Sequence, residues 1–259
     1  MNIKFLLLGT SLSLIPQYAS AQCTTTPDCT SMGYKETTNK GGCLKCPTGN
    51  GWYCPPPKEE KAVLGECTGY AKNCKIADIL NSDGTCTTDK ENSKTPLGVV
   101  IAIKDNCGYT MTASPIETKS AWGLGDVTKL PSYKNWQDAI KDFNTKENTQ
   151  KLIQVGNSTA QKAANYSPNT APSTKGKWLL PSAGILNSLY TNLSTINNII
   201  SKLNGIQLIN DNEHIWSSSM TAYGYTWLFC TGSGSDSGIS WGTEQGGNED
   251  TSIRPVLAF

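Results

Sequence analysis

Few residues in this 259-residue chain are of types that could support nucleophilic catalysis. His214 is the single histidine, and three serines follow it at positions 217–219. Neighbouring side chains of a strand point to opposite faces, whereas a nucleophile and its base must converge on one point. Cys230 with His214 could imitate a thiol enzyme, but a cysteine in a disulfide-rich exported chain is more commonly bridged. We therefore predict that the protein is not an enzyme.

The ten cysteines predict a disulfide framework, as is typical of exported proteins. Eight of them lie between positions 23 and 86, and only Cys107 and Cys230 lie beyond. The simplest pairing closes four bridges among the first eight and joins Cys107 to Cys230. Cys43 and Cys46 have the spacing of zinc ligands, but no second such pair completes a site.

No cofactor is predicted, with calcium left open as the alternative. The glycine-rich stretch at 232–238 lacks the lysine and the following helix of a phosphate-binding loop. The oxygen-rich triplets at 211–213 and 248–250 could ligate calcium, although such clusters are more commonly solvated turns.

Residues 1–21 predict a secretory signal peptide. Lys4 supplies the positive charge, residues 5–15 are mostly apolar, and Ala19 and Ala21 form the small-residue pattern that precedes cleavage. No run approaches the ~20 apolar residues of a membrane-spanning helix. Removal of the signal leaves equal numbers of basic and acidic residues, which does not favour nucleic acid as a partner. We predict a secreted, periplasmic or cell-surface protein without a membrane span.

The mature chain divides by composition into three parts. Residues 22–57 are rich in Gly, Thr, Pro and Cys, and their few apolar side chains predict a small module that depends on disulfides. The charged residues 58–62 predict a linker after three consecutive prolines. Residues 63–259 predict one larger domain.

The hydrophobic pattern of the larger domain predicts an α+β fold with an antiparallel sheet and flanking helices. Helical spacing is found at 133–147, at 159–166 and twice within 182–203, where Ser182 is a candidate N-cap and Asn204 with Gly205 a candidate stop. Predicted strands lie at 76–80, 85–88, 98–103, 215–219, 225–231, 238–242 and 252–259.

Four sequence words of this domain resemble the DUF1566 family, which is also named for the C-terminal domain of a Legionella collagen-like adhesin. The words are WLLPS at 178–182, IWSSS at 215–219, YTWLF at 225–229 and RPVLAF at 254–259. The resemblance implies a C-type-lectin-like fold over 63–259 and an extracellular binding or adhesion role.

Several residues of these words are predicted to be structural. Each tryptophan should bury its ring and use its indole N–H once. Arg254 should donate hydrogen bonds to carbonyls where the last strand joins the sheet. The predicted structural residues are Trp178, Pro181, Trp216, Trp227 and Arg254.

The loops at 220–225 and 232–250 are predicted to bind an extracellular glycan or protein, because loops on a rigid sheet commonly carry recognition. Their aromatic and short polar side chains suit a sugar or a protein epitope. The alternative is a structural or assembly protein of the cell envelope without a small-ligand site. The candidate ligand-binding residues are Tyr223, Tyr225, Asp236, Trp241, Glu244, Gln245 and Asn248.

Overall fold

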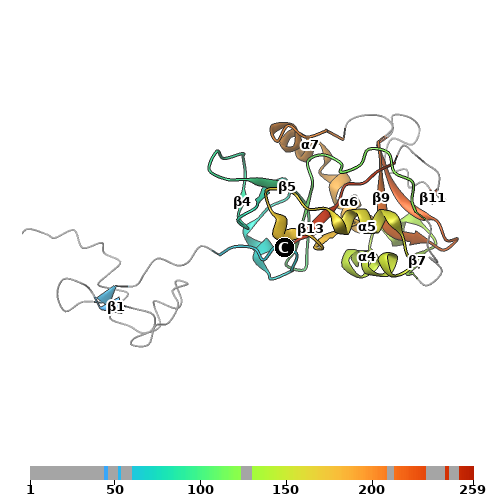
Figure 1. The fold of residues 1–259 in the computed structure, drawn as a ribbon, viewed down its shortest axis with the longest axis horizontal. Helices are drawn as coiled ribbons and strands as arrows, with labels where there is room; N and C mark the ends of the chain where they lie inside the picture. Colours follow the sequence, from blue (N-terminus) through green and yellow to red (C-terminus); the bar gives the residue numbers. More distant parts are fainter. Residues whose placement is uncertain are drawn as a thin grey trace, which may run out of the picture. The chain divides into compact units, whose positions relative to one another are not determined.

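The computed structural model consists of two compact units, Met1–Glu60 and Lys61–Phe259 (Figure 1). It describes residues 44–45, 52–53, 60–123, 130–208, 213–231, 243–244 and 251–259. In the first unit, β1 (Leu44–Lys45) and β2 (Trp52–Tyr53) pair antiparallel. The predicted signal peptide and the first two residues of the predicted linker, 58–59, lie outside the described residues. Within the described part, no helix has the length and apolar character needed to cross a membrane.

Six antiparallel strands form one sheet of the second unit, in the order β4-β3-β5-β6-β13-β8. The predicted hairpin at its start is confirmed, because the Gly84 N–H bonds the Asn81 carbonyl at 2.9 Å and Gly84 has a φ of 82°. The strands are β3 (Ile79–Asn81), β4 (Cys86–Thr87), β5 (Pro96–Lys104), β6 (Cys107–Met111), β8 (Trp178–Leu179) and β13 (Val256–Ala258).

A second sheet has the order β11-β10-β9-β12, and β7 also pairs with β9. Neighbours β9, β10 and β11 are antiparallel, whereas β7 and β12 run parallel to β9. The sheet is therefore mixed, not purely antiparallel as predicted. Its strands are β7 (Ser132–Tyr133), β9 (Glu213–Thr221), β10 (Thr226–Thr231), β11 (Thr243–Glu244) and β12 (Thr251–Ser252).

The prediction of one continuous strand over 252–259 is wrong. The chain pairs with β9 through Ser252, then leaves that sheet and enters the six-stranded sheet at Val256. Pro255 stands at this crossing, where proline leaves no N–H unpaired and its carbonyl accepts the Thr112 N–H at 3.3 Å. The predicted strand at 238–242 lies outside the described residues.

The predicted helices at 159–166 and within 182–203 are confirmed. The stop after α7 is also confirmed: Asn204 has a φ of 56°, and the N–H groups of Asn204 and Gly205 bond the carbonyls of Ser201 and Ile200, both at 2.9 Å. The α-helices are α3 (Trp136–Ala139), α4 (Thr145–Gln154), α5 (Ser158–Asn165), α6 (Ala183–Thr191) and α7 (Leu193–Lys202). Two short 3-10 turns are η1 (Tyr70–Asn73) and η3 (Pro172–Thr174).

The prediction of one helix over 133–147 is wrong, because the segment breaks between α3 and α4. The Asp142 carboxylate accepts the Asn144 backbone N–H at 2.9 Å, which stabilises a turn in place of a helical hydrogen bond. Trp136, expected on a buried stripe, is 46% exposed.

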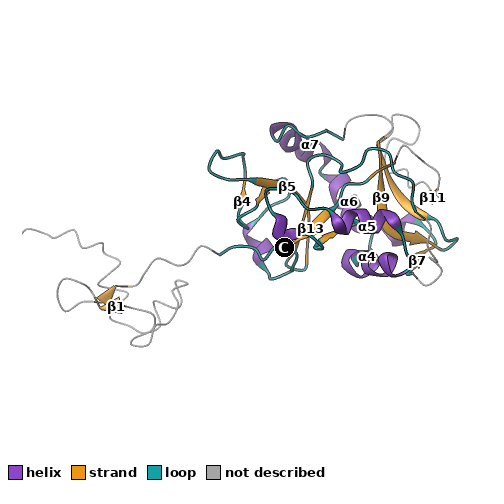
Figure 2. Ribbon diagram, viewed as in Figure 1, coloured by secondary structure: helices purple, strands orange, loops and turns teal. Residues whose placement is uncertain are grey.

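Two hydrophobic clusters join the sheets and helices. One lies between the sheets and contains Val99 and Ile101 of β5, Ile185 of α6, Ile200 of α7 and Phe229 of β10. The other packs α4 and α5 on the opposite face of β9 and β10. In the view of Figure 2, α6 lies between the strands at the two ends of this unit.

The predicted disulfide between Cys107 and Cys230 is wrong. Cys107 pairs with Cys67, and Cys74 pairs with Cys86. Cys107 begins β6 in one sheet, whereas Cys230 is a buried residue of β10 in the other. The expectation of four bridges within the first eight cysteines fails as well, because Cys67 bonds outside that group.

We predict that loss of either bridge lowers the free energy of unfolding. A chain-entropy estimate gives about 3 kcal/mol for the bridge of sequence separation 12, and about 4 kcal/mol for that of separation 40. Chemical denaturation of Cys74→Ser and Cys67→Ser variants measures these losses. Peptide mapping without reduction checks the pairing, and a peptide linking Cys107 to Cys230 would contradict it.

Candidate functional site

The turn between β9 and β10 is held by its own hydrogen bonds. The Thr221 N–H donates to the Tyr225 carbonyl at 2.7 Å, and the Gly224 N–H to the Thr221 carbonyl at 3.2 Å. The Thr221 hydroxyl oxygen accepts the backbone N–H groups of Tyr223 at 3.3 Å and Tyr225 at 3.0 Å. Gly224 has a φ of 81°, a conformation that glycine adopts without steric cost. The backbone of this turn is therefore fixed before any ligand arrives.

This turn presents Tyr223 to solvent, with 78% of the side chain exposed, while Tyr225 is half-buried. Glu244 lies on β11, and its Cα pairs with that of Thr226 at the base of the turn. These three predicted residues therefore belong to one end of the five-stranded sheet. The remaining predicted residues, Asp236, Trp241, Gln245 and Asn248, lie outside the described part of the chain.

A further exposed aromatic residue, Trp136, belongs to the same end of the sheet. Strand β7 runs parallel to β9, with Tyr133 opposite Thr221, so the chain leaves both strands at the same edge. The Ala222 N–H bonds the Tyr133 carbonyl at 3.1 Å and ties the two segments together. Figure 1 shows β7, β9 and β11 in the same region of the second unit, at the right of the view, where β10 separates β11 from β9 in the sheet.

Sequence reasoning missed Trp136 because it assigned the residue to a buried helical stripe. The signal that could have found it is Asn135, whose side chain accepts the Asp138 N–H at 2.9 Å. Asparagine is a favoured N-cap, so it predicts a helix that begins at Trp136 and not at Tyr133. We call the end of the sheet that carries Trp136, Tyr223 and Tyr225 the aromatic edge.

Behind the aromatic edge lies a buried carboxylate, Asp142, which is 2% exposed. One of its oxygens accepts the Asn148 side-chain amide and the Ser219 hydroxyl, both at 2.7 Å. The other accepts the Asn144 backbone N–H at 2.9 Å. These donors come from the turn between α3 and α4, from α4 and from β9, so the carboxylate joins three segments of the chain.

Ser182 joins the same network instead of capping α6 with its side chain. It occupies the N-cap position, but its hydroxyl donates to the Asp142 carbonyl at 2.7 Å and accepts the Thr145 hydroxyl at 2.8 Å. The N–H of Ala183, the first residue of α6, donates to the Ser219 hydroxyl oxygen at 2.9 Å. The serines of WLLPS and IWSSS therefore meet around one residue.

The three serines of β9 lie in an irregular part of the strand, because its register against β10 shifts between Trp216 and Met220. The Ser219 hydroxyl donates to the Asp142 carboxylate at 2.7 Å and accepts the Ala183 N–H at 2.9 Å. The hydrogen bonds of this hydroxyl therefore belong to the Asp142 network.

Tyr133 lies against the Asp142 network. Burial raises the pKa of its hydroxyl, and the charge of Asp142 and a hydrogen bond to its carboxylate raise it further, to about 12. The neutral hydroxyl is therefore the form that this environment stabilises.

The three tryptophans of the sequence words are buried, and each indole N–H donates one hydrogen bond. Ser218, two residues after one of these tryptophans, donates its N–H to the Pro181 carbonyl at 2.8 Å. The indole bonds run from Trp178 to the Thr174 hydroxyl at 3.0 Å, from Trp216 to the Ser120 carbonyl at 2.7 Å and from Trp227 to the Met220 carbonyl at 3.1 Å.

Arg254 is fully buried at the crossing between the two sheets. Its guanidinium donates to the carbonyls of Ala113 at 3.1 Å and Ile206 at 2.7 Å. The planar fork of donors thus joins the segment after β6 to the segment after α7.

In the described ranges, no group of three or more His, Cys, Asp or Glu side chains is placed to hold a metal ion. Of the two triplets that could ligate calcium, residues 211–212 and 248–250 lie outside those ranges, and only the backbone of Glu213, at the start of β9, is described.

No protein-family model matches the chain, and no curated protein matches it. Among solved structures, the chain is similar to the crystal structure of a fimbrial protein from Bacteroides ovatus, with 12% sequence identity and a TM-score of 0.48. The match covers 71% of this chain and 48% of that chain, so this chain spans about half of that protein's length. A likeness of this size assigns neither a family nor a function, and the resemblance to DUF1566 stays a prediction.

We predict that Asp142→Asn lowers the free energy of unfolding by about 2–4 kcal/mol. Both carboxylate oxygens accept hydrogen bonds, and in the variant the amide NH₂ replaces one of them and faces donor groups in a buried site. Denaturant unfolding measures the loss. The matched control is Asp138→Asn, an exposed carboxylate of α3, for which we expect a change within about 0.5 kcal/mol. Equal effects of the two substitutions would contradict the central role of Asp142.

We also predict that Tyr133 ionises late in an alkaline titration. Its folded-state pKa of about 12 exceeds the ordinary 10.0, so its contribution to stability is complete below pH 10.0 and is lost as the pH rises toward about 12. In an ultraviolet titration of tyrosine ionisation, the Tyr133→Phe variant should lack one transition at high pH that the unmodified full chain shows. An unchanged late region in that variant would show that Tyr133 titrates normally.

Proposed function

We propose that this protein is an exported, non-enzymatic binding or adhesion protein that recognises an extracellular ligand through the aromatic edge. The observation that supports this most is the exposure of Tyr223, at 78%, on a turn whose backbone is already hydrogen-bonded. An aromatic ring held on a rigid turn loses little conformational entropy when it binds.

A glycan suits this edge better than a large protein interface. The exposed large hydrophobic residues of the described part are scattered over different elements and form no broad apolar patch. Single aromatic rings beside short polar side chains instead suit the faces of sugar rings. The exposed large hydrophobic residues of the described part are Val63, Trp136, Tyr190, Ile206 and Tyr223.

The proposal includes a C-type-lectin-like, DUF1566-type domain over 63–259. Two features support it: antiparallel β-structure with flanking helices, and the convergence of Ser182 and Ser219, from two of the quoted words, on Asp142. Export is supported by the two disulfides of the second unit.

We predict that the mature full-length protein retains one class of glycan on a glycan array and that Tyr223→Ala weakens this binding about tenfold or more, as expected for a central aromatic contact. Trp136→Ala should weaken it as well. The matched control is Tyr190→Ala, which removes a partly exposed ring of α6 near Phe229, far in sequence from the edge. Binding that survives Tyr223→Ala would overturn the proposed site.

Thermal unfolding of each variant separates loss of binding from loss of folding. Since Tyr223 is mostly exposed, its removal should leave the unfolding temperature unchanged. A chain that retains no glycan and forms a stable oligomer in light scattering would favour the envelope-assembly role instead.

A further inference from the structure

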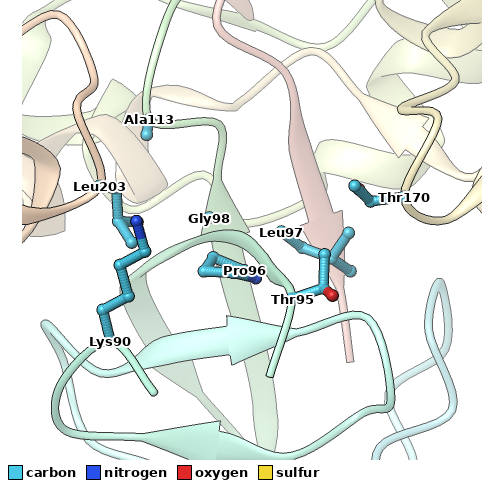
Figure 3. A pocket seen from close by; sticks show the side chains of 8 residues that line it. All are labelled: Lys90, Thr95, Pro96, Leu97, Gly98, Ala113, Thr170 and Leu203. Atoms are coloured by element: carbon cyan, nitrogen blue, oxygen red, sulfur yellow. The ribbon is translucent and has the colours of Figure 1, made fainter. Parts of the chain in front are cut away.

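A small cleft lies at the start of β5, among residues that the proposed ligand site does not use. It has a volume of ≈ 260 Å³. Pro96 and Leu97 of β5 form one side, Leu203 after α7 and Ala113 after β6 form the other, and Lys90 stands at the rim (Figure 3). Its walls are mostly apolar, and Gly98 and the hydroxyl-bearing residues Thr95 and Thr170 complete the lining.

The wall of Ala113 and Leu203 is built rigidly. Arg254 bonds the carbonyls of Ala113 and Ile206, so it fixes the segment after β6 against the segment after α7. Gly205 packs so closely on Ala113 that a Cβ at this position would clash with it. A cleft with walls fixed in this way exists before a ligand arrives and loses little entropy on binding.

The opposite wall is also fixed by the backbone. Pro96 pairs with Asn81 of β3, and the Ser82 N–H bonds the Thr95 carbonyl at 2.8 Å. The loop before β5 is tied to α7 by an ion pair between Asp89 and Lys202, with the charged atoms 3.1 Å apart. Lys90 follows Asp89 directly, and its backbone N–H donates to the Asp89 carboxylate at 2.9 Å.

Lys90 provides a charge at this rim. Its neighbours Lys94 and Lys202 pair with Asp83 at 2.6 Å and Asp89 at 3.1 Å. No carboxylate in the described part of the chain forms an ion pair with the Lys90 ammonium, which reaches toward Leu203 in Figure 3. An apolar cleft with a cation at its rim is complementary to a small apolar group that carries a negative charge.

We propose that this cleft binds a small aliphatic carboxylate, with the alkyl group on Pro96, Leu97 and Leu203 and the carboxylate on the Lys90 ammonium. The volume suits a group of about the size of one amino-acid residue. Such a group occurs as a free branched-chain acid or as the last residue of a peptide with an aliphatic side chain. The site is separate from the aromatic edge and does not depend on the proposed glycan binding.

The test follows N-acetyl-leucine binding to the mature full-length protein by NMR, through the amide shifts of Leu97, Gly98 and Ala113. We expect saturable shifts at these amides, and binding about three- to tenfold weaker for N-acetyl-leucinamide, which lacks the charge, and for Lys90→Ala. Lys104→Ala, at the other end of β5, is the matched control and should bind as the unmodified protein does.

Isovalerate and a peptide that ends in leucine distinguish the two sources of the carboxylate. Tighter binding of the peptide indicates a chain terminus, and equal binding indicates a free acid. The proposal is overturned if no saturable shift occurs, if the amide probe binds as well as the acid, or if Lys104→Ala weakens binding as much as Lys90→Ala. Unfolding temperatures confirm that each variant is folded.

Discussion

The hydrogen bonds that one buried carboxylate, that of Asp142, requires constrain much of the second unit. A charged or polar group removed from water is costly unless hydrogen bonds replace its hydration. Asp142 obtains them from Asn144, from Asn148 of α4 and from Ser219 of β9. Through its carbonyl it also holds Ser182, at the start of α6. Two helices and the central strand of the five-stranded sheet are therefore positioned relative to one another by polar contacts that tolerate little displacement.

This constraint connects the interior to the proposed binding surface. The same strand that supplies Ser219 ends at Thr221, whose hydroxyl and backbone organise the turn that presents Tyr223. The break in the helix at Asp142 leaves α3 short, and Trp136 at its first position remains exposed. The residues that form the buried polar network are thus close in the chain to those that present the exposed aromatic edge.

The C-terminal word RPVLAF has a comparable role in the other sheet. Arg254 joins two segments through their carbonyls, and β13 then inserts between β6 and β8. The buried Phe259 ring lies against Gly108, where a Cβ would clash with it. Phe259 is therefore part of the core, and the wall of the cleft beside β5 is rigid because Arg254 joins the segments that form it.

The elements whose signals are local could be predicted from the sequence: the hairpin at Asn81 to Gly84, strand β5, helices α5 to α7, and Tyr223 as a residue of a turn. Periodicity and turn residues report on contiguous stretches, so these features need no knowledge of distant segments. The start of α3 at Trp136 has a local signal in the N-cap Asn135, whereas two other features follow only from the three-dimensional structure: the pairing of Cys107 and the division of the last strand between two sheets. Each of these depends on which segments far apart in the chain come into contact, and local pattern carries no information about that.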